Sequence, residues 1–354
     1  MIDSNTDFFK IVDNFAKTAH VPSIPIIEAK LDFVPKVTIA IPTYKRPDLL
    51  KDALESALNQ VGYDEYDVMV VDNNPERNCE TEKLIYSYSD KRLSYYKNAE
   101  NLGMEGNWNR LFTFAKGPWV VMLHDDDLLL PDFIRVCMSI VFKHPNIGIL
   151  KPLQYEWYDD GKKLKLPGFT CTKKLKRIYE IDNLRGFVLG PPTGLLLNKE
   201  KVHLIGGFNS EMHPSSDFCF IVLFSYFFQV YQIDQVLSIY RWMQNESLKA
   251  ATLQGFINND YHLYSYLFKH FKFPNKLSEN ILNFKFMGIE ELYRKIDENL
   301  KFDIKILGMQ SINPKVGLLS YYLLRCIILL FRFVYACGGK LIFKKRQFNC
   351  FDCF

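Results

Sequence analysis

Apolar runs of strand length alternate with amphipathic stretches through the first half of the chain. Runs bounded by Gly, Pro or polar residues predict strands at 37–41, 67–71, 93–97 and from 119 onward. The stretches between them carry apolar residues at helical spacing and predict helices at 48–59, near 81–89 and ending near 116. Strands that alternate with helices indicate an α/β fold with a mostly parallel sheet and right-handed crossovers.

Three consecutive carboxylates, Asp125, Asp126 and Asp127, follow the apolar run that starts at Trp119 and are called the carboxylate triplet below. Three negative charges at the end of one strand repel each other unless a cation lies among them. Mg²⁺ and Mn²⁺ prefer oxygen ligands and keep positions open for phosphate oxygens, so the triplet predicts a divalent cation site. The alternative is an acidic helix N-terminus, because a helix could begin at Pro131.

Polar residues also follow the first two predicted strands. Pro42, Thr43 and Tyr44 come after the first strand, and Asp72 and Asn73 come after the second. Ligands of parallel sheets bind beyond the carboxyl ends of the strands. We therefore expect these residues and the carboxylate triplet to line one crevice.

The pattern divides the chain into four segments. Residues 1–35 are weakly amphipathic and then rich in proline, and we expect them to be an extension packed outside the main fold. Residues 36–245 hold the α/β domain, in which Asp160-Gly161 predicts a hairpin and hence a mixed sheet in the second half. Residues 246–310 are predicted to be helical, and residues 311–354 form an apolar and basic tail.

The tail contains an almost continuous apolar stretch, Val316–Cys337, that also carries Arg325 and Arg332. About 20 apolar residues span a bilayer, but a central arginine costs several kcal/mol there. A helix that lies in the membrane interface lets both guanidinium groups reach water and phosphate. The basic residues that follow, at 340 and 344–346, suit anionic headgroups. The alternative is a buried helix of a helical subdomain with two paired arginines.

Composition bears on partners and location. A net charge of +4 over 354 residues does not indicate a nucleic-acid partner. The eight cysteines show no disulfide framework, which suits a reducing cytosol. The N-terminus has no basic region followed by an apolar run, so we expect no secretory signal. Together with the tail, this predicts a cytoplasmic protein that is peripheral on the inner face of the cell membrane.

Several motifs carry a resemblance to a known family. They are the first strand with its loop at 37–44, Val70–Asn74, the segment Asn101–Asn109, the carboxylate triplet with Pro131, and Gly206–Asn209 followed by Ser216-Asp217. In combination they resemble glycosyltransferase family 2 over residues 36–245, and the triplet has the spacing of that family's DxD motif. The resemblance implies the nucleotide-sugar-binding GT-A fold, which is an α/β fold. The apolar and basic tail adds a C-terminal helical, membrane-associating extension to this expectation.

The family implies roles for individual residues. The implied nucleotide-binding residues are Pro42, Thr43, Tyr44, Asp72, Asn73, Asn101, Asp125 and Asp126. A tyrosine ring offers stacking area, and Asp or Asn can read the polar edge of a base or a ribose hydroxyl. Asp127 is the expected direct ligand of Mn²⁺ or Mg²⁺, with Asp126 as a second metal contact, while His124 is expected to be a packed neighbour. Asn73 stands where many relatives have a second Asp, which leaves the base open.

Transfer to an acceptor also needs a base. A hydroxyl group has a pKa too high to attack as an alkoxide at neutral pH, so a carboxylate must accept its proton. The resemblance assigns this role to Asp217, with Ser216 in place of the family's usual Glu, and implies inversion by one direct displacement. The alternative is that Asp217 is simply the N-terminal carboxylate of the apolar helix that follows.

Three further residues are expected near the diphosphate or the sugar: Arg241, Thr193 and Gly194. Arg241 suits phosphate oxygens, and a structural salt bridge is its alternative role. Met243 stands where relatives often have a His near the diphosphate, and a thioether is a poor ligand for a hard cation.

These expectations combine in an inverting glycosyltransferase that moves a sugar from a nucleotide diphosphate sugar to a surface glycan or a lipid-linked glycan. A nucleotidyltransferase is a second enzymatic interpretation, but no glycine-rich, basic triphosphate loop follows the first strand. The interpretation from another class is a catalytically silent nucleotide- or sugar-binding component of a glycan-assembly complex. The departures at Ser216 and Met243 keep that alternative open.

Overall fold

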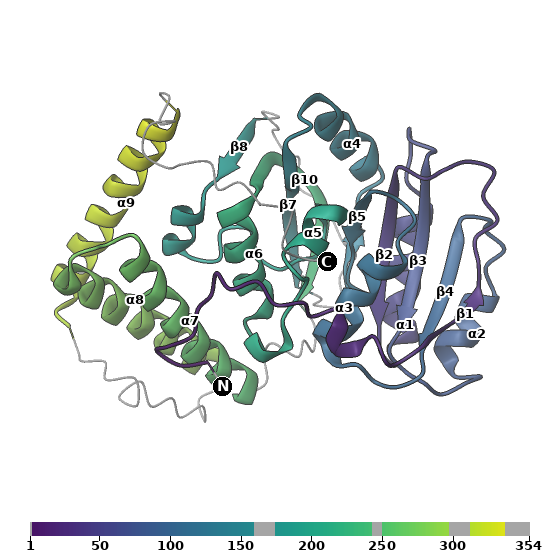
Figure 1. Cartoon of the computed structure of the whole chain (residues 1–354), viewed down its shortest axis with the longest axis horizontal. Helices are drawn as coiled ribbons and strands as arrows, with labels where there is room; N and C mark the ends of the chain where they lie inside the picture. Colours follow the sequence, from purple (N-terminus) through teal and green to yellow (C-terminus); the bar gives the residue numbers. More distant parts are fainter. Residues whose placement is uncertain (1, 159–173, 243–249, 297–311, 337–354) are drawn as a thin grey trace. The chain divides into compact units, whose positions relative to one another are not determined.

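The structure is a computed structural model that describes residues 2–158, 174–242, 250–296 and 312–336 (Figure 1). The chain divides into two compact units. The first holds Phe9–Ile178 and Leu189–Lys249, and the second holds Ile2–Phe8, Tyr179–Val188 and Ala250–Phe354. The predicted hairpin at Asp160-Gly161, Met243 and the basic residues at 340 and 344–346 lie outside the described residues. The predicted boundaries at 36, 246 and 311 remain predictions.

Ten strands among the described residues form one mixed sheet in the first unit. They are β1 (Ser23–Ile27), β2 (Val37–Thr43), β3 (Tyr66–Asp72), β4 (Leu93–Asn98), β5 (Trp119–Met122), β6 (Leu128–Leu129), β7 (Ile147–Tyr158), β8 (Leu175–Ile178), β9 (Leu195–Asn198) and β10 (Gln229–Trp242). Their order is β1-β4-β3-β2-β5-β9-β7-β10-β6, with β8 beside β10.

The sheet has a parallel half and a mixed half, as the sequence predicts. β4, β3, β2 and β5 are parallel to one another, whereas β9 is antiparallel to both β5 and β7. In the parallel half Thr43 pairs with Asp72, and Asp72 pairs with Lys97, so the strands end at one edge. The polar residues that follow these strands are therefore carried to the same edge of the sheet.

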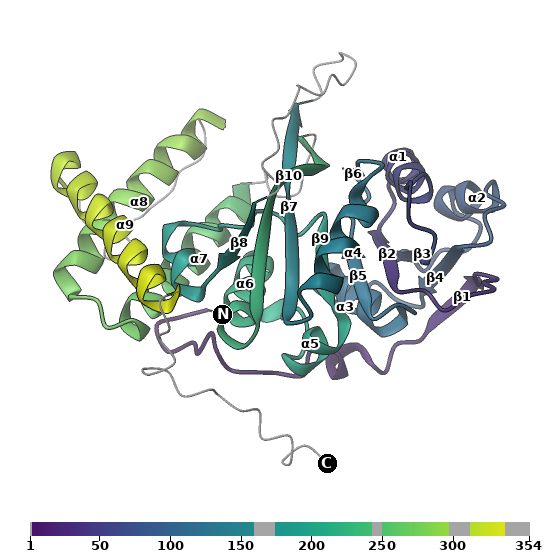
Figure 2. The same ribbon diagram turned by 90° about the horizontal axis from the view of Figure 1, so that it is seen from above.

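Helices cover both faces of this sheet (Figure 2). In the first unit they are α1 (Pro47–Leu58), α2 (Glu80–Tyr86), α3 (Gly103–Phe114), α4 (Phe133–Lys143), α5 (Lys199–Leu204) and α6 (Ser216–Phe227), with short 3-10 helices η1 (Ala16–Thr18) and η3 (Ser210–Met212). One core joins α1 and α4 to β2 and β3. On α3, Trp108 packs edge-on against Phe208, which stacks on Phe220 of α6. Every residue of β2, β3, β4 and β5 is buried, which explains the nearly continuous apolar runs of β2, β3 and β5.

The N-terminal segment is attached more closely than the sequence predicted. β1 pairs antiparallel with β4 at the sheet edge, where its Pro25 is tolerated. Asn14 donates hydrogen bonds to the carbonyl of Gly206 from both its backbone N–H, at 2.9 Å, and its side-chain amide, at 3.1 Å. A Cβ on Gly206, whose φ is +81°, would lie 1.9 Å from the carbonyl oxygen of Val12. The expectation of an extension outside the main fold is thus wrong for β1 and for the residues around Asn14.

The described residues of the second unit are mostly helical, which agrees with the prediction for 246–310 where those residues are described. It contains η2 (Glu180–Arg185), α7 (Ala250–His270), α8 (Asn275–Ile296) and α9 (Pro314–Ala336). The rings of Tyr261 and Tyr264 on α7 pack edge-on against Phe286 of α8. These aromatic residues form the core of the second unit.

Helix α9 has one packed face and one exposed apolar face. Leu324 and Ile328 are buried, whereas the exposed apolar residues are Val316, Leu318, Leu319, Tyr322, Leu323, Leu329, Leu330, Phe333 and Val334. Among the described residues this is one helix, at Pro314–Val334, that is long and apolar enough to cross a membrane. Arg325 is exposed, but Arg332 binds both carboxylate oxygens of the buried Asp182 at 2.9 Å. The expectation that both guanidinium groups reach water and phosphate is therefore wrong for Arg332.

Candidate active site at the carboxyl ends of the strands

The carboxylate triplet lies in the turn between β5 and β6. The N–H of Asp127 donates to the carbonyl of His124 at 3.2 Å, which closes this turn. Helix α4 begins only at Phe133, so the triplet is not the first turn of a helix. The geometry agrees with carboxylates that are delivered by a strand to the sheet edge.

Two residues of the loop after β2 contact the triplet. The hydroxyl of Thr43 donates to Asp125 Oδ2 at 2.8 Å. The guanidinium of Arg46 forms ion pairs with Asp125 Oδ1 at 2.5 Å and with Asp126 Oδ2 at 2.9 Å. Thr43 was predicted at this site from the sequence, whereas Arg46, only two residues after Tyr44, was not.

Asp127 is the most enclosed member of the triplet. Its Oδ1 accepts the N–H of Arg241 at 2.8 Å, and its Oδ2 is buried without a hydrogen-bond partner among the described residues. Burial, followed by the neighbouring Asp126, raises the pKa of Asp127 to about 8. Burial also raises the pKa of Asp125 to about 7, although Arg46 opposes this shift. Both groups hold a proton readily unless a cation stabilises their charge.

A buried lysine near the triplet was also missed. Lys151 of β7 donates to Gln154 Oε1 at 3.1 Å, to the carbonyl of Pro191 at 3.0 Å and to the carbonyl of Thr193. Burial lowers the pKa of Lys151 to about 7, while Asp127 acts to raise it. The signal in the sequence was a single lysine inside an apolar strand, since a buried charge needs partners.

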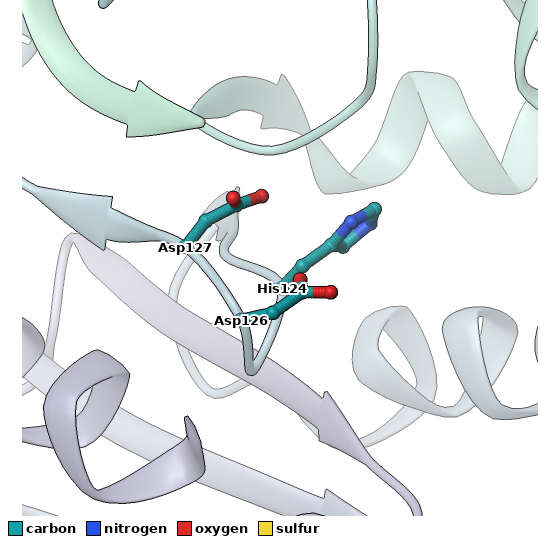
Figure 3. A group of neighbouring side chains, drawn as sticks. All are labelled: His124, Asp126 and Asp127. Atoms are coloured by element: carbon teal, nitrogen blue, oxygen red, sulfur yellow. The ribbon is translucent and has the colours of Figure 1, made fainter. Parts of the chain in front are cut away.

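Three side chains from this turn could hold a metal ion. One ligand atom from each of His124, Asp126 and Asp127 can be chosen such that all lie within 4.8 Å of one another (Figure 3). Burial lowers the pKa of His124 to about 4, so its ring is neutral at neutral pH, and its Nε2 is buried without a partner among the described residues. The two carboxylates suit Mn²⁺ or Mg²⁺, whereas a neutral imidazole is a typical ligand of transition metals. The ring of His124 also stacks on Trp108, so the expected packing role is present as well.

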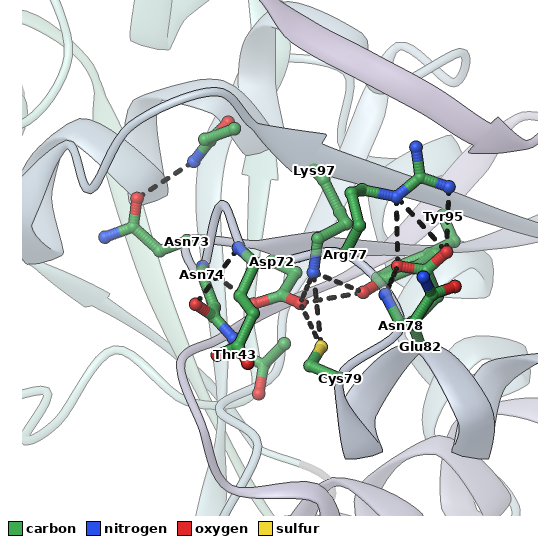
Figure 4. Close-up of polar contacts among 12 residues, drawn as sticks. Thr43, Asp72, Asn73, Asn74, Arg77, Asn78, Cys79, Glu82, Tyr95 and Lys97 are labelled. Atoms are coloured by element: carbon green, nitrogen blue, oxygen red, sulfur yellow. Dashed lines mark hydrogen bonds and ion pairs between the residues drawn. The ribbon is translucent and has the colours of Figure 1, made fainter.

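Asp72 supports the loop after β3 instead of presenting an open carboxylate. It is 0% exposed. Its Oδ2 accepts hydrogen bonds from Tyr95 at 2.7 Å and from Lys97 at 2.8 Å, and its Oδ1 accepts the N–H of Asn74 at 2.9 Å (Figure 4). Cys79 lies beside this cluster, with its Sγ 3.3 Å from the ammonium of Lys97. Both carboxylate oxygens of Asp72 are already engaged, which argues against a direct contact with a base.

Asn73 and Asn101, both predicted site residues, contact each other. The amide of Asn73 donates to Asn101 Oδ1 at 2.6 Å, and Asn73 Oδ1 accepts from Asn98 at 3.0 Å. Asn98 also donates to Asn107 at 2.9 Å. These amides tie the loop after β3 to the start of α3, so they fix the shape of the expected nucleotide loop.

The other predicted residues of the first loop differ in accessibility. Pro42 is buried within β2, whereas the ring of Tyr44 is 42% exposed directly after the strand. Lys45 has a φ of +55°, which turns the chain between Tyr44 and Arg46. Tyr44 is therefore the residue of this loop that is free to stack on a ligand ring.

Thr193 and Gly194 lie against the carboxylate turn. The hydroxyl of Thr193 accepts the N–H of His124 at 3.3 Å, and the N–H of Gly194 donates to the carbonyl of Met122 at 2.7 Å. Both residues are thus brought to the predicted site, where Thr193 is fully buried.

The side chain of Arg241 is engaged by protein groups. Its side chain donates to the carbonyl of Asp126, to Asp52 Oδ2 at 2.8 Å and to the carbonyl of Leu49 at 3.3 Å, and the residue is 4% exposed. The salt-bridge alternative is therefore the one that this geometry favours.

Ser216, the neighbour of Asp217, contacts α3. Its hydroxyl donates to Glu105 Oε1 at 2.8 Å, and Glu105 lies one helical turn before Trp108, which stacks on His124. Asp217 is partly buried and its Oδ1 accepts the N–H of Phe218 at 2.7 Å, as the helix-start interpretation expects. Its role as a base stays a prediction.

The fold and the acidic edge together define a class of proteins, the nucleotide-sugar transferases with a GT-A fold. Residues 38–188 match the model of the family described as "Glycosyl transferase family 2". This stretch, which contains the carboxylate triplet, thus matches the family that the sequence motifs resemble.

Curated relatives support this family. An uncharacterized glycosyltransferase of Methanocaldococcus jannaschii is 30% identical over 153 residues, which are 42% of this chain and 53% of the relative. The hyaluronan synthase of Pasteurella multocida is 24% identical over 199 residues, which are 55% of this chain and 19% of the synthase. The chain thus spans about half or less of the length of these relatives.

Two solved structures share the fold at low sequence identity. The structure of S. aureus TarS 1–349 in complex with UDP-GlcNAc has a TM-score of 0.56 and 16% identity, over 76% of this chain and 77% of that one. The mannosyltransferase PcManGT from Pyrobaculum calidifontis, in complex with GDP-Man and Mn²⁺, has a TM-score of 0.50 and 14% identity, over 92% of both chains. These likenesses confirm the predicted GT-A fold.

Proposed function

We propose that this protein transfers a sugar, with inversion and with the help of a divalent cation, from a nucleoside diphosphate sugar to a glycan or lipid-linked glycan. The observation that carries the proposal is the convergence of His124, Asp126 and Asp127, whose ligand atoms lie within 4.8 Å of one another. They lie at the sheet edge where Thr43, at the end of β2, contacts the carboxylate triplet. The bound ligands of TarS and PcManGT support this donor class.

Asp126 and Asp127, with His124 beside them, are the residues that would hold the cation. When bound, Mn²⁺ or Mg²⁺ would neutralise the charge that develops on the departing diphosphate. The burial of the Asp127 carboxylate supports this assignment, because a cation would stabilise its charge. Asp125 is already bound to Thr43 and Arg46, so we assign it to the ribose or to an ordered water.

For the nucleoside we assign the exposed ring of Tyr44 to stacking on the base. The asparagine contacts between Asn73 and Asn101 hold the neighbouring loop in place. Asp72 supports this loop, because its carboxylate accepts the N–H of Asn74. A rigid, preformed loop reduces the entropy lost when the donor binds.

Asp217 is our candidate base. As the acceptor oxygen bonds to the anomeric carbon, the bond from that carbon to the diphosphate oxygen breaks, and the acceptor proton passes to the Asp217 carboxylate. This single displacement inverts the anomeric centre and needs no covalent enzyme intermediate. The path from Ser216 through Glu105 to the residues around His124 supports a position near the donor.

The test is metal-dependent release of the nucleoside diphosphate from a panel of nucleotide sugars, with and without acceptors. We expect Asp217→Asn to bind the donor normally and to lose at least a hundredfold in transfer, since a general base contributes about 10²–10⁴-fold. Asp127→Ala should lose metal-dependent donor binding as well. Asp64→Asn, an exposed carboxylate change, is the matched control. Equal release by all four proteins would refute these residue roles, whereas no release by the wild type would support the catalytically silent alternative.

We further propose that the exposed apolar face of α9 contacts the inner face of the cell membrane, which brings the site to a lipid-linked acceptor. The solvent-exposed Leu319 and Leu330 support this, and so do the basic residues that follow the helix in the sequence. We expect Leu319→Glu with Leu330→Glu to abolish flotation with phosphatidylglycerol vesicles. Phe142→Glu, an exposed apolar position on α4, should float like the wild type. Unchanged flotation of the double variant would refute the assignment.

A further inference from the structure

Arg46 is a cation of the protein's own that occupies the acidic edge. Its two ion pairs engage Asp125 and Asp126, whose side chains are 1% and 13% exposed, while the Arg46 side chain itself is 43% exposed. Its backbone is fixed independently, because its carbonyl accepts the N–H of Leu50 at 3.0 Å in the first turn of α1. The guanidinium can therefore move without a change in the loop.

The same edge is where we place the divalent cation. Asp126 takes part both in the Arg46 ion pair and in the candidate metal site with His124 and Asp127. A guanidinium and a divalent cation that share one carboxylate repel each other strongly at such distances. Binding of the metal should thus weaken the ion pair between Asp126 and Arg46.

A displaced guanidinium needs a new anion, and the donor brings one. Arginine presents five N–H donors that match two phosphate oxygens at once. Arg241, the phosphate-binding arginine that the sequence suggested, is held by Asp52 and by two backbone carbonyls, and it is buried. Arg46, by contrast, is half exposed, and in the described part of the chain its guanidinium is paired with the carboxylate triplet.

We propose that Arg46 balances the charge of the metal-free carboxylate triplet and is transferred to the diphosphate of the donor when the metal and the nucleotide bind. The inference rests on the proposed function and assigns the diphosphate-binding arginine of that site. Arg46 should therefore weaken the binding of the metal alone and strengthen the binding of the nucleotide.

The experiment measures both affinities in the full-length protein. Binding of Mn²⁺ alone is followed by the loss of the free-ion EPR signal, and binding of UDP, GDP, ADP and CDP at saturating Mn²⁺ is followed by calorimetry. We expect Arg46→Gln to bind Mn²⁺ alone about tenfold more tightly. It should bind the preferred nucleoside diphosphate about 10- to 100-fold more weakly, as expected for lost charged hydrogen bonds.

Two variants make the result specific. Arg46→Lys keeps the charge and loses the two-point contact, so we expect Mn²⁺ affinity close to that of the wild type and weaker nucleotide binding. Arg135→Gln, which removes an exposed arginine paired with Asp132 on α4, should change neither affinity. A merely structural role of Arg46 would lower both affinities or leave both unchanged.

The outcomes separate the inference from the proposed function. If the wild type binds Mn²⁺ and a nucleoside diphosphate but Arg46→Gln does not tighten Mn²⁺ binding, the charge-balancing role is refuted and the proposed function stands. If Arg46→Gln binds the nucleotide as the wild type does, the transfer to the diphosphate is refuted. A wild type that binds neither probe overturns the proposed function, and this inference with it.

Discussion

Asp67 allows a quantitative test of the sheet that carries the site. This carboxylate lies in β3, is 1% exposed, and accepts a hydrogen bond from the Thr38 hydroxyl at 2.7 Å. Thr38 in turn accepts the N–H of Gly117 at 2.9 Å. Burial raises the pKa of Asp67 from 3.8 to about 6. Asp67→Asn keeps an oxygen that can accept the Thr38 hydrogen bond but cannot ionise.

The sign of the effect follows from the raised pKa. Between about pH 4 and pH 6 the folded state binds more protons than the unfolded state, so the ionisable Asp67 lowers stability as the pH rises. The two pKa values correspond to a cost of about 1 kcal/mol at pH 4.5 and about 3 kcal/mol above pH 7. The stability of Asp67→Asn relative to the wild type should therefore be about 2 kcal/mol greater at pH 7.5 than at pH 4.5.

Urea unfolding followed by tryptophan fluorescence measures this difference. All four tryptophans, at 108, 119, 157 and 242, belong to the first unit, so the signal reports on the unit that contains Asp67. Asp64→Asn, at an exposed position three residues earlier, should stay within about 0.5 kcal/mol of the wild type at both pH values. A stability difference between Asp67→Asn and the wild type that does not depend on pH would refute the reasoning.

Two further predictions concern the missed lysine and the tail helix. Lys151→Met should lower the stability of the first unit by about 2 kcal/mol, because the carbonyls of Pro191 and Thr193 lose their donor, and urea unfolding would detect this; a stability equal to that of the wild type would contradict it. Arg332→Ala should destabilise the second unit by about 3 kcal/mol, since Asp182 is left as a buried charge without its partner. Hydrogen exchange in α9 measures this loss, and the exposed Arg325→Ala should leave exchange unchanged.

Much of the fold could be predicted because its central strands are buried on both faces. The apolar runs that became β2, β3 and β5 are almost free of interruption, and helices with one apolar face lie between the strands. β1 was missed because it is a short edge strand with a proline, Pro25, which lacks the alternating pattern of a covered strand. Edge strands depend on a neighbour that lies far along the chain, here β4.

The sequence predicted which residues lie at the candidate site better than it predicted the contacts between them. Parallel strands share an edge, so the meeting of Thr43 with Asp125 followed from the topology. The pair of Arg241 with Asp52 joins residues 189 positions apart, and no local pattern reveals it. Tyr95 and Lys97 could have been anticipated as partners of Asp72, because residues two apart in a strand lie on one face.

The hydrogen bonds from Asn14 to Gly206 affect which truncated forms of the protein would keep the site intact. Lys17 adds a second tie, because its ammonium contacts Asn209 at 3.0 Å and Glu211 at 2.8 Å, a few residues before Asp217. A fragment that begins at residue 38, where the family match begins, would remove Asn14 and Lys17 and leave the groups at 206–211 without these partners. The segment before β2 thus helps to hold the residues just upstream of the candidate base, and its removal should impair turnover even when the whole chain from residue 38 onward is kept.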